Sequence, residues 1–218
     1  MGKRLLPFRQ YNEHDVVNMF ALSTGNLTAT QSITETHSGD AGVFVKINGG
    51  NLDLDPVTYG NNSYLGKTDY PFVGANQYPT ASLTVTAASS SDIRPLGITL
   101  WETALYDENG QKLLYYPQKA YENQVLLPGQ PVPVATKGIF TITDVAYNNS
   151  SNWSVGNPFV LSSVAGKVTG VAANYQQTGT TNVAAVIGTI LATGTRGANG
   201  ATIADKYSGS YSVIKLNA

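Results

Sequence analysis

The chain has 218 residues, of which only 12% are charged, and its formal net charge is −1. This length suffices for one large β domain or two small ones, and the chain lacks the basic excess that binds phosphates or an anionic membrane surface. We therefore expect neither nucleic acid nor a membrane as a partner. The sequence has no cysteine, which excludes disulfides and thiolate metal sites.

The N-terminal segment combines basic and apolar residues in a short space. Its first apolar run ends at Arg9, too early for the core of a signal peptide, so we expect no export signal. Residues 13–21 are expected to form a short helix, with Asn12 as its N-cap. Residues 23–41 are rich in Ser, Thr and Gly, and they predict a loop or an extended arm.

We expect residues 1–22 to become ordered only against a neighbouring subunit or the surface of a larger assembly, because their apolar set would favour aggregation in water. The basic residues would pair with acidic groups on that partner, and the apolar residues would fill a groove in it. In the alternative interpretation, the segment packs onto its own barrel. The candidate interface residues are Lys3, Arg4, Leu5, Leu6, Phe8, Arg9, Val16, Val17, Met19 and Phe20.

Short β-branched and aromatic runs, separated by Gly, Pro, Asn and Asp, predict strands along most of the chain. One hairpin is expected around the turn at residues 48–51, before Leu52 and Leu54, and a second joins 99–107 to 113–116. In the second hairpin, Asn109-Gly110 fits a type I′ turn. Further strands are expected at 83–86, 97–100, 124–127, 132–135, 138–143, 159–162, 185–191 and 211–216.

The predicted fold class is all-β, with a β-barrel or β-sandwich of short antiparallel strands. A small-residue link at 87–91 suggests a division at about residue 90. Residues 1–90 would form an N-terminal arm and a β-hairpin region, and residues 91–218 would form the barrel domain. The longest apolar stretch, 183–192, is too short to span a membrane and is expected to be a buried strand.

No motif nominates a catalytic, cofactor or metal site, so we expect a non-enzymatic protein. His14 and His37 are far apart, and Gly66-Lys67-Thr68 lacks the earlier glycine of a phosphate-binding loop. Asp53 and Asp55 share one strand face and leave a cation site as an alternative, although an ordinary turn is the favoured interpretation.

Aromatic residues are the more informative feature, since the chain contains 13 Tyr and 2 Trp. Tyrosine is enriched at protein interfaces because it combines a large apolar ring with a polar tip. We expect the following tyrosines to contact a neighbouring subunit, with a carbohydrate platform as the alternative: Tyr59, Tyr64, Tyr70 and Tyr78.

From about Ile98 onward, the chain resembles the β-barrel cement and decoration proteins of tailed phages. The resemblance lies in repeated strand-and-turn phrases, LPGQPVPVATKGIF at 127–140, SVGNPFVL at 154–161 and AGKVT at 165–169. It also includes the closing strands AVIGTIL at 185–191 and YSVIKL at 211–216. The opening residues, 3–18, resemble the start of virion structural proteins from phages of cyanobacteria.

This resemblance implies a virion protein that binds the outer surface of the assembled capsid and stabilises it. It would be made in the host cytoplasm, and its partners would be the major capsid protein and further copies of itself, with a homotrimer favoured. Two alternatives stay open. One is a structural component of the neck, tail or baseplate, and the other is a carbohydrate-binding adhesin on the particle.

Overall fold

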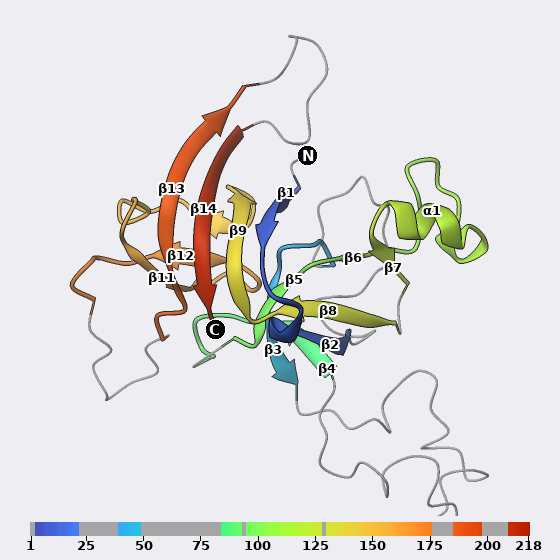
Figure 1. Cartoon of the computed structure of the whole chain (residues 1–218), viewed down its shortest axis with the longest axis horizontal. Coiled ribbons are helices and arrows are strands. Elements are labelled where there is room, and N and C mark those ends of the chain that lie inside the picture. The colour runs from blue at the N-terminus through green and yellow to red at the C-terminus, as the bar shows by residue number, and fades with distance from the viewer. Residues whose placement is uncertain are drawn as a thin grey trace, which may run out of the picture.

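The computed structural model describes residues 3–21, 39–48, 84–92, 95–127, 130–175, 185–197 and 209–218. These residues form mainly β-strands, which confirms the predicted all-β class. Figure 1 shows a curved sheet on the left, a second group of strands below and to its right, and a small helical projection on the right, opposite the sheet.

The curved sheet has seven strands, in the order β1-β9-β14-β13-β11-β12-β10. All neighbouring strands are antiparallel except β10 and β12, which are parallel. The strand bounds are β1 Leu5–Gln10, β9 Lys137–Thr143, β10 Tyr147–Asn148, β11 Pro158–Leu161, β12 Val168–Gly170, β13 Gly188–Arg196 and β14 Gly209–Asn217.

The second group is a five-stranded ring, in which each strand pairs with two neighbours and the pairings return to the first strand. Going round the ring, these strands are β2 Val16–Ala21, β4 Thr84–Ala87, β3 Phe44–Asn48, β5 Gly97–Thr99 and β8 Pro131–Ala135. The β2–β4 pair is parallel and the other four pairs are antiparallel. The sheet and the ring therefore both take strands from before and after residue 90, where the sequence suggested a division.

One two-stranded ribbon joins the sheet to the ring. Residues 5–21 run antiparallel to residues 131–143, first as β1 on β9 and then as β2 on β8. We call this pair the N-terminal ribbon. At its corner, the carbonyl of Asp15 accepts hydrogen bonds from the backbone N and the Oγ1 of Thr136, at 2.8 and 3.0 Å. The ribbon makes the two β units one continuous structure.

Gly138 permits the close approach at this corner. Its φ is +144°, and a Cβ there would lie 2.7 Å from the carbonyl oxygen of Gln10 and 2.9 Å from the Cβ of Tyr11. A side chain would therefore push the two strands of the N-terminal ribbon apart.

The predicted helix at 13–21 is wrong. Only Glu13–Asp15 is helical, as the single 3-10 turn η1, and Val16 begins strand β2. The capping prediction was sound, because the Oδ1 of Asn12 accepts from the backbone N of His14 at 3.1 Å. Two consecutive β-branched valines favour a strand, and β8 supplies its backbone partner.

The main hydrophobic core lies between the sheet and the ring. Phe44 and Ile98 of the ring belong to the same buried cluster as Phe140 and Phe159 of the sheet. A second buried cluster, formed by Val43 and apolar side chains of the neighbouring strands, lies within the ring. The start of strand β3 is thus buried on both faces, at Phe44 and Val45, and this explains why its first apolar residues are consecutive, whereas Ile47 further along is exposed.

The further strands expected between residues 83 and 216 are confirmed, within a few residues, as β4, β5, β7 to β9, β11, β13 and β14. The strand expected at 185–191 starts later, at Gly188, and continues to Arg196. The second arm of the hairpin expected around residues 48–51 lies outside the described residues.

Candidate functional site: an aromatic projection

Residues 101–127 leave the ring after β5 and return to it before β8, and we call this segment the projection. Its base is a parallel pair, β6 Glu102–Thr103 with β7 Val125–Leu126. Figure 1 shows the projection, with helix α1 Pro117–Glu122, standing to one side of both β units. The pairing of β6 with β7 therefore holds the two ends of the segment together, and the outer part of the segment extends into solvent.

A tight turn at residues 107–111 shapes one end of the projection. The N of Gly110 donates to the carbonyl of Asp107 at 3.2 Å, and Gly110 has a φ of +76°. Gly110 is the only residue of this turn with positive φ, so the turn is type I followed by a left-handed glycine, and the predicted type I′ turn is wrong.

The hairpin expected around this turn is reduced to a single bridge, Tyr106 with Lys112. Residues 113–115 form the 3-10 turn η3 Leu113–Tyr115 instead of a strand. Pro117 follows at the first turn of α1, where the missing N–H of proline costs no helical hydrogen bond.

A buried carboxylate holds the turn and the helix together. The Oδ1 of Asp107 accepts from the backbone N of Asn109 and of Gln111, at 2.8 and 2.7 Å. Its Oδ2 lies 2.7 Å from the Nζ of Lys119 on α1, and Lys119 also lies 2.8 Å from Glu108 Oε1. We call Asp107, Glu108 and Lys119 the lysine clamp.

The lysine clamp alters the pKa of each member. The hydrogen bond from Lys119 lowers the pKa of the Asp107 carboxyl and that of the Glu108 carboxyl. The same contacts raise the pKa of Lys119. All three groups are therefore held in their charged forms at neutral pH.

Aromatic side chains are concentrated on the outer surface of the projection. Four large apolar or aromatic residues are strongly exposed within eight positions, Leu114 at 59%, Tyr115 at 71%, Tyr116 at 46% and Tyr121 at 72%. The ring of Tyr121 meets Trp101 edge-on, with centroids 5.7 Å apart. We call these five residues the aromatic patch, in which Trp101 is partly buried and also packs against the main core. A grouped exposed patch of this kind is typical of an interaction site, whereas single exposed apolar residues are ordinary.

The sequence interpretation missed the aromatic patch. It assigned residues 113–116 to a strand, and in a strand alternate side chains would have pointed inward. The available signal was Pro117 directly after two tyrosines, which ends a strand and starts a helix.

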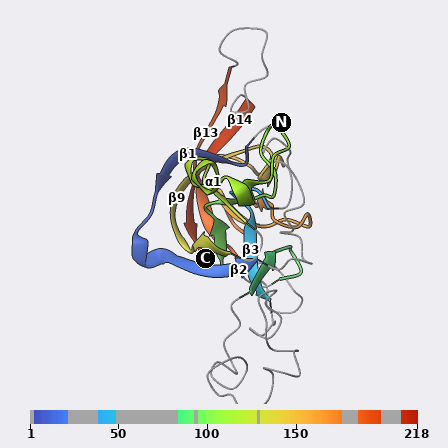
Figure 2. The same ribbon diagram turned by 90° about the vertical axis from the view of Figure 1, so that its right-hand side faces the viewer.

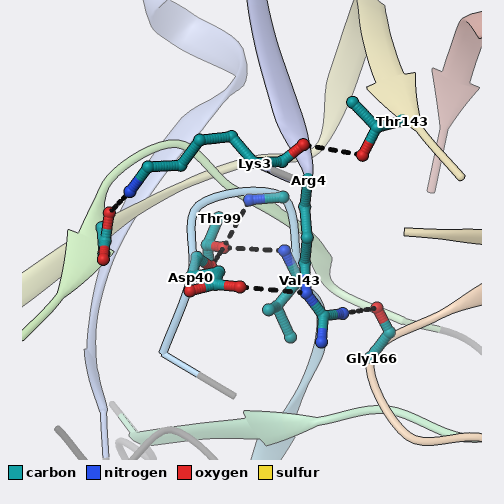
Figure 3. Close-up of polar contacts among 9 residues, drawn as sticks. Lys3, Arg4, Asp40, Val43, Thr99, Thr143 and Gly166 are labelled. Carbon is teal, nitrogen blue, oxygen red and sulfur yellow. Dashed lines mark hydrogen bonds and ion pairs between the residues drawn. The ribbon is translucent and has the colours of Figure 1, made fainter. Parts of the chain in front are cut away.

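The basic residues expected to bind a partner are engaged within the chain itself. Arg4 is buried, with its Nε 3.4 Å from Asp40 Oδ2 and its Nη1 3.4 Å from the carbonyl of Gly166. Figure 3 shows Arg4 between the 39–43 loop and Gly166. Burial lowers the pKa of the Arg4 guanidinium, and the carboxylate of Asp40 opposes this shift. The proposed pairing of Arg4 with acidic groups on a partner is wrong.

Lys3 and Arg9 likewise bind within the chain. Lys3 pairs with the buried carboxylate of Glu102 at the base of the projection, and its carbonyl accepts from Thr143 Oγ1 at 2.6 Å (Figure 3). Arg9 donates to the carbonyls of Leu6 and Leu100.

The apolar candidates in the N-terminal segment divide into two groups. Leu5, Leu6 and Met19 are buried in the chain's own core, so a role in filling a partner's groove is wrong for them. Phe8 is 60% exposed and Val17 is 39% exposed, and Val16 is partly buried. The alternative interpretation, that the segment packs onto its own β structure, describes β1 and β2 as observed.

The remaining candidates lie outside what the structure describes. This holds for the side chain of Phe20 and for Tyr59, Tyr64, Tyr70 and Tyr78, and also for His37, Asp53 and Asp55. Within the described residues, no group of three or more His, Cys, Asp or Glu side chains could hold a metal ion.

The described helices are all too short or too polar to cross a bilayer. Comparisons of the chain with protein-family models, with curated proteins and with solved structures found no match.

Proposed function

We propose that this protein is a structural component of a tailed-phage particle that binds the outer surface of the assembled capsid as a cement or decoration protein. It would act by shifting an equilibrium toward the assembled shell. A protein that binds only the assembled shell stabilises that shell by mass action, by about 2.7 kcal/mol per site at a free concentration 100 times Kd.

The aromatic patch is the observation that carries this proposal. Tyr and Trp are enriched at protein interfaces, where a few of them supply most of the binding energy. The projection presents Tyr115 and Tyr121 in solvent on a segment that is pinned at its base and fixed by the lysine clamp. Such preorganisation reduces the entropy cost of binding.

The low charge of the chain also supports attachment to a protein surface rather than to nucleic acid. The N-terminal ribbon adds to this support, because a body with two β units joined by continuous strands can transmit a load between two contact points. A cement protein needs such a body to bridge neighbouring capsid subunits.

Copy number tests the location on the particle. Densitometry of purified particles should find this protein in amounts comparable to the major capsid protein, whereas a neck, tail or baseplate ring has of order ten copies. A low copy number would move the proposal from the capsid to those parts of the virion.

Shell binding tests the patch. The double variant Tyr115→Ala/Tyr121→Ala should bind purified shells roughly 30-fold more weakly, because loss of interface anchors costs about 2 kcal/mol or more. A matched control is Val155→Ala/Val164→Ala, which removes exposed apolar side chains elsewhere, at 58% and 47% exposure. Equal binding by both variants would contradict a role for the patch.

A carbohydrate-binding adhesin is the second candidate, and the edge-on pair of Trp101 and Tyr121 favours it as a place where a sugar ring could stack. Binding of the isolated protein to host polysaccharide, abolished in the same tyrosine variant, would support the adhesin. Binding to shells alone would favour cement.

A further inference from the structure

The outer half of β13 is an open strand edge within the described residues. Strand β11 pairs with β13 only at Gly188 and Thr189, and the last contact on that side is with Ile190. From Ala192 to Arg196, β13 pairs on its other side with β14, and Leu191 lies at the register shift between Ile190 and Ala192. Figures 1 and 2 show this hairpin rising beyond the rest of the sheet. The five residues from Leu191 to Thr195 present an edge of about 17 Å.

This edge lacks the features that usually prevent strand pairing between molecules. Residues 191–195 have the sequence LATGT, with neither charge nor proline. Its only irregularity is a register shift at the base, between Ile190 and Ala192. The edge strand β1, in contrast, contains Pro7 and a register shift in its middle. At the opposite edge, β10 is only two residues long.

The hairpin is also held in an extended form. Gly194 pairs with Tyr211 across the hairpin, and a Cβ on Gly194 would lie 2.6 Å from the Tyr211 hydroxyl. The tyrosine ring therefore covers the glycine and stiffens a position that would otherwise weaken the strand. The edge is ready for pairing without prior rearrangement.

We propose that this edge binds the same edge of a second copy of the chain, in antiparallel orientation about a two-fold axis. The pairing would join the two seven-stranded sheets into one. Main-chain hydrogen bonds would supply the binding energy, as in other strand additions.

Charge and side-chain type favour a second copy as the occupant. Residues 191–195 are uncharged, so identical edges meet without repulsion. In an antiparallel pair, the two Arg196 side chains lie at opposite ends of the joint. Thr193 and Thr195 are exposed on the edge, and cross-strand threonine pairs are favourable. A two-fold contact is self-complementary by symmetry.

This contact is separate from the aromatic patch and goes beyond shell binding. It would link two shell-bound copies to each other, and the shell would raise their effective concentration so that a weak contact suffices. It predicts a two-fold contact in addition to, or instead of, the trimer that the sequence resemblance favours.

Single-cysteine variants can test the geometry directly, since the chain contains no cysteine. Cysteines are placed one at a time at positions 191 to 195 and oxidised under mild conditions. Strands that pair about a two-fold axis bring one position close to its own copy, so one variant should form disulfide dimers much faster than its neighbours. The control is Ser163→Cys, at an exposed position away from β13. If no edge variant cross-links faster than this control, the proposal is wrong.

Charge variants test the same edge contact without introducing cysteine. Thr193→Lys/Thr195→Lys should weaken dimerisation in sedimentation by at least about tenfold, because like charges meet across the joint. Thr193→Val/Thr195→Val, which keeps the β-branched shape, should retain dimerisation. Mixing the lysine variant with Thr193→Glu/Thr195→Glu should restore dimers.

A native chain that stays monomeric at high concentration, or a lysine variant that dimerises normally, would overturn the edge contact. The shell-binding proposal is measured separately, with the tyrosine variant, so the two can fail independently.

Discussion

The β body and the projection are stabilised by different forces. In the body, large side chains such as Phe140, Phe159 and Trp153 are buried between the sheet and the ring. The projection has a core of only four small or medium side chains, Ala104, Leu113, Ala120 and Val125. Its turn and its helix are joined instead by the polar contacts of the lysine clamp.

This difference implies two levels of stability. Burial of apolar area stabilises the body at any pH, whereas the clamp depends on ionised groups. The projection should therefore open locally while the body stays folded. The aromatic patch thus lies on the part of the molecule whose stability depends most on pH.

Removal of residues 1–22 should have the largest effect and abolish cooperative thermal melting. The deletion takes β1 from the sheet and β2 from the ring, and it leaves β8 and β9 each with only one of their two partner strands. Circular dichroism would measure the transition. The full-length variant Phe8→Ser/Val17→Thr, changed only at exposed positions of the same segment, should melt normally. A truncated protein that still melts cooperatively would show that the N-terminal ribbon is dispensable.

Trp153→Ala should come next, with a loss of about 3–5 kcal/mol of unfolding free energy, or roughly 10 °C in Tm. The Trp153 ring stacks on Tyr147 at 4.2 Å, and its Nε1 donates to the buried Ser212 Oγ at 2.7 Å. Trp153→Phe keeps an aromatic ring but loses the donor, and it should cost about 1–3 kcal/mol. If Trp153→Ala were no worse than Val155→Ala, this stack would not be part of the stabilising core.

Lys119→Met should have the smallest effect on the whole molecule, because it loosens only the projection. Amide exchange at Asn109 and Gln111, whose N–H groups donate to Asp107, should accelerate while the main Tm stays unchanged. The matched control is Lys112→Met, at an exposed lysine of the same segment. Equal exchange in both variants would contradict the clamp.

The same variant has a defined pH signature. Because the folded-state pKa values of Asp107 and Glu108 lie below their ordinary values of 3.8 and 4.5, the clamp's contribution is complete above those values. It is lost as the pH falls through the lowered pKa values of the folded state. Protection of the projection should therefore fall below about pH 4 in the native chain. The fall should be smaller in Lys119→Met, where only the backbone hydrogen bonds from Asn109 and Gln111 still lower the pKa of Asp107.

The strands that could be predicted from sequence were those with local signals. Residues 138–143 and 211–216 combine β-branched residues with nearby turns, and both became strands. Strand β2 could not be recognised in the same way, because its apolar residues fit a helical face and its partner β8 lies more than 100 residues away. Long-range pairing overrode a weak local preference.

The candidate site was less predictable for a related reason. Tyrosines near Gly and Pro were recognised as interface candidates, but exposure depends on which residues turn inward around Leu113 and Ala120. Arg4 and Lys3 resembled a basic interaction segment, yet their partners Asp40 and Glu102 are distant in sequence. A charged residue can be assigned to a partner or to the chain itself only when the tertiary contacts are known.

The N-terminal ribbon also affects when the chain can fold. Residues 5–21 are made early, but their partners extend to Thr143, and β9 in turn pairs with β14, which ends at Asn217. At about 5–20 residues per second, synthesis of the intervening 120 or so residues takes on the order of ten seconds. During this interval Leu5, Leu6 and Met19 have no native burial site. Folding is therefore late and dominated by non-local pairing, which places it among slow β topologies and exposes the nascent chain to chaperones.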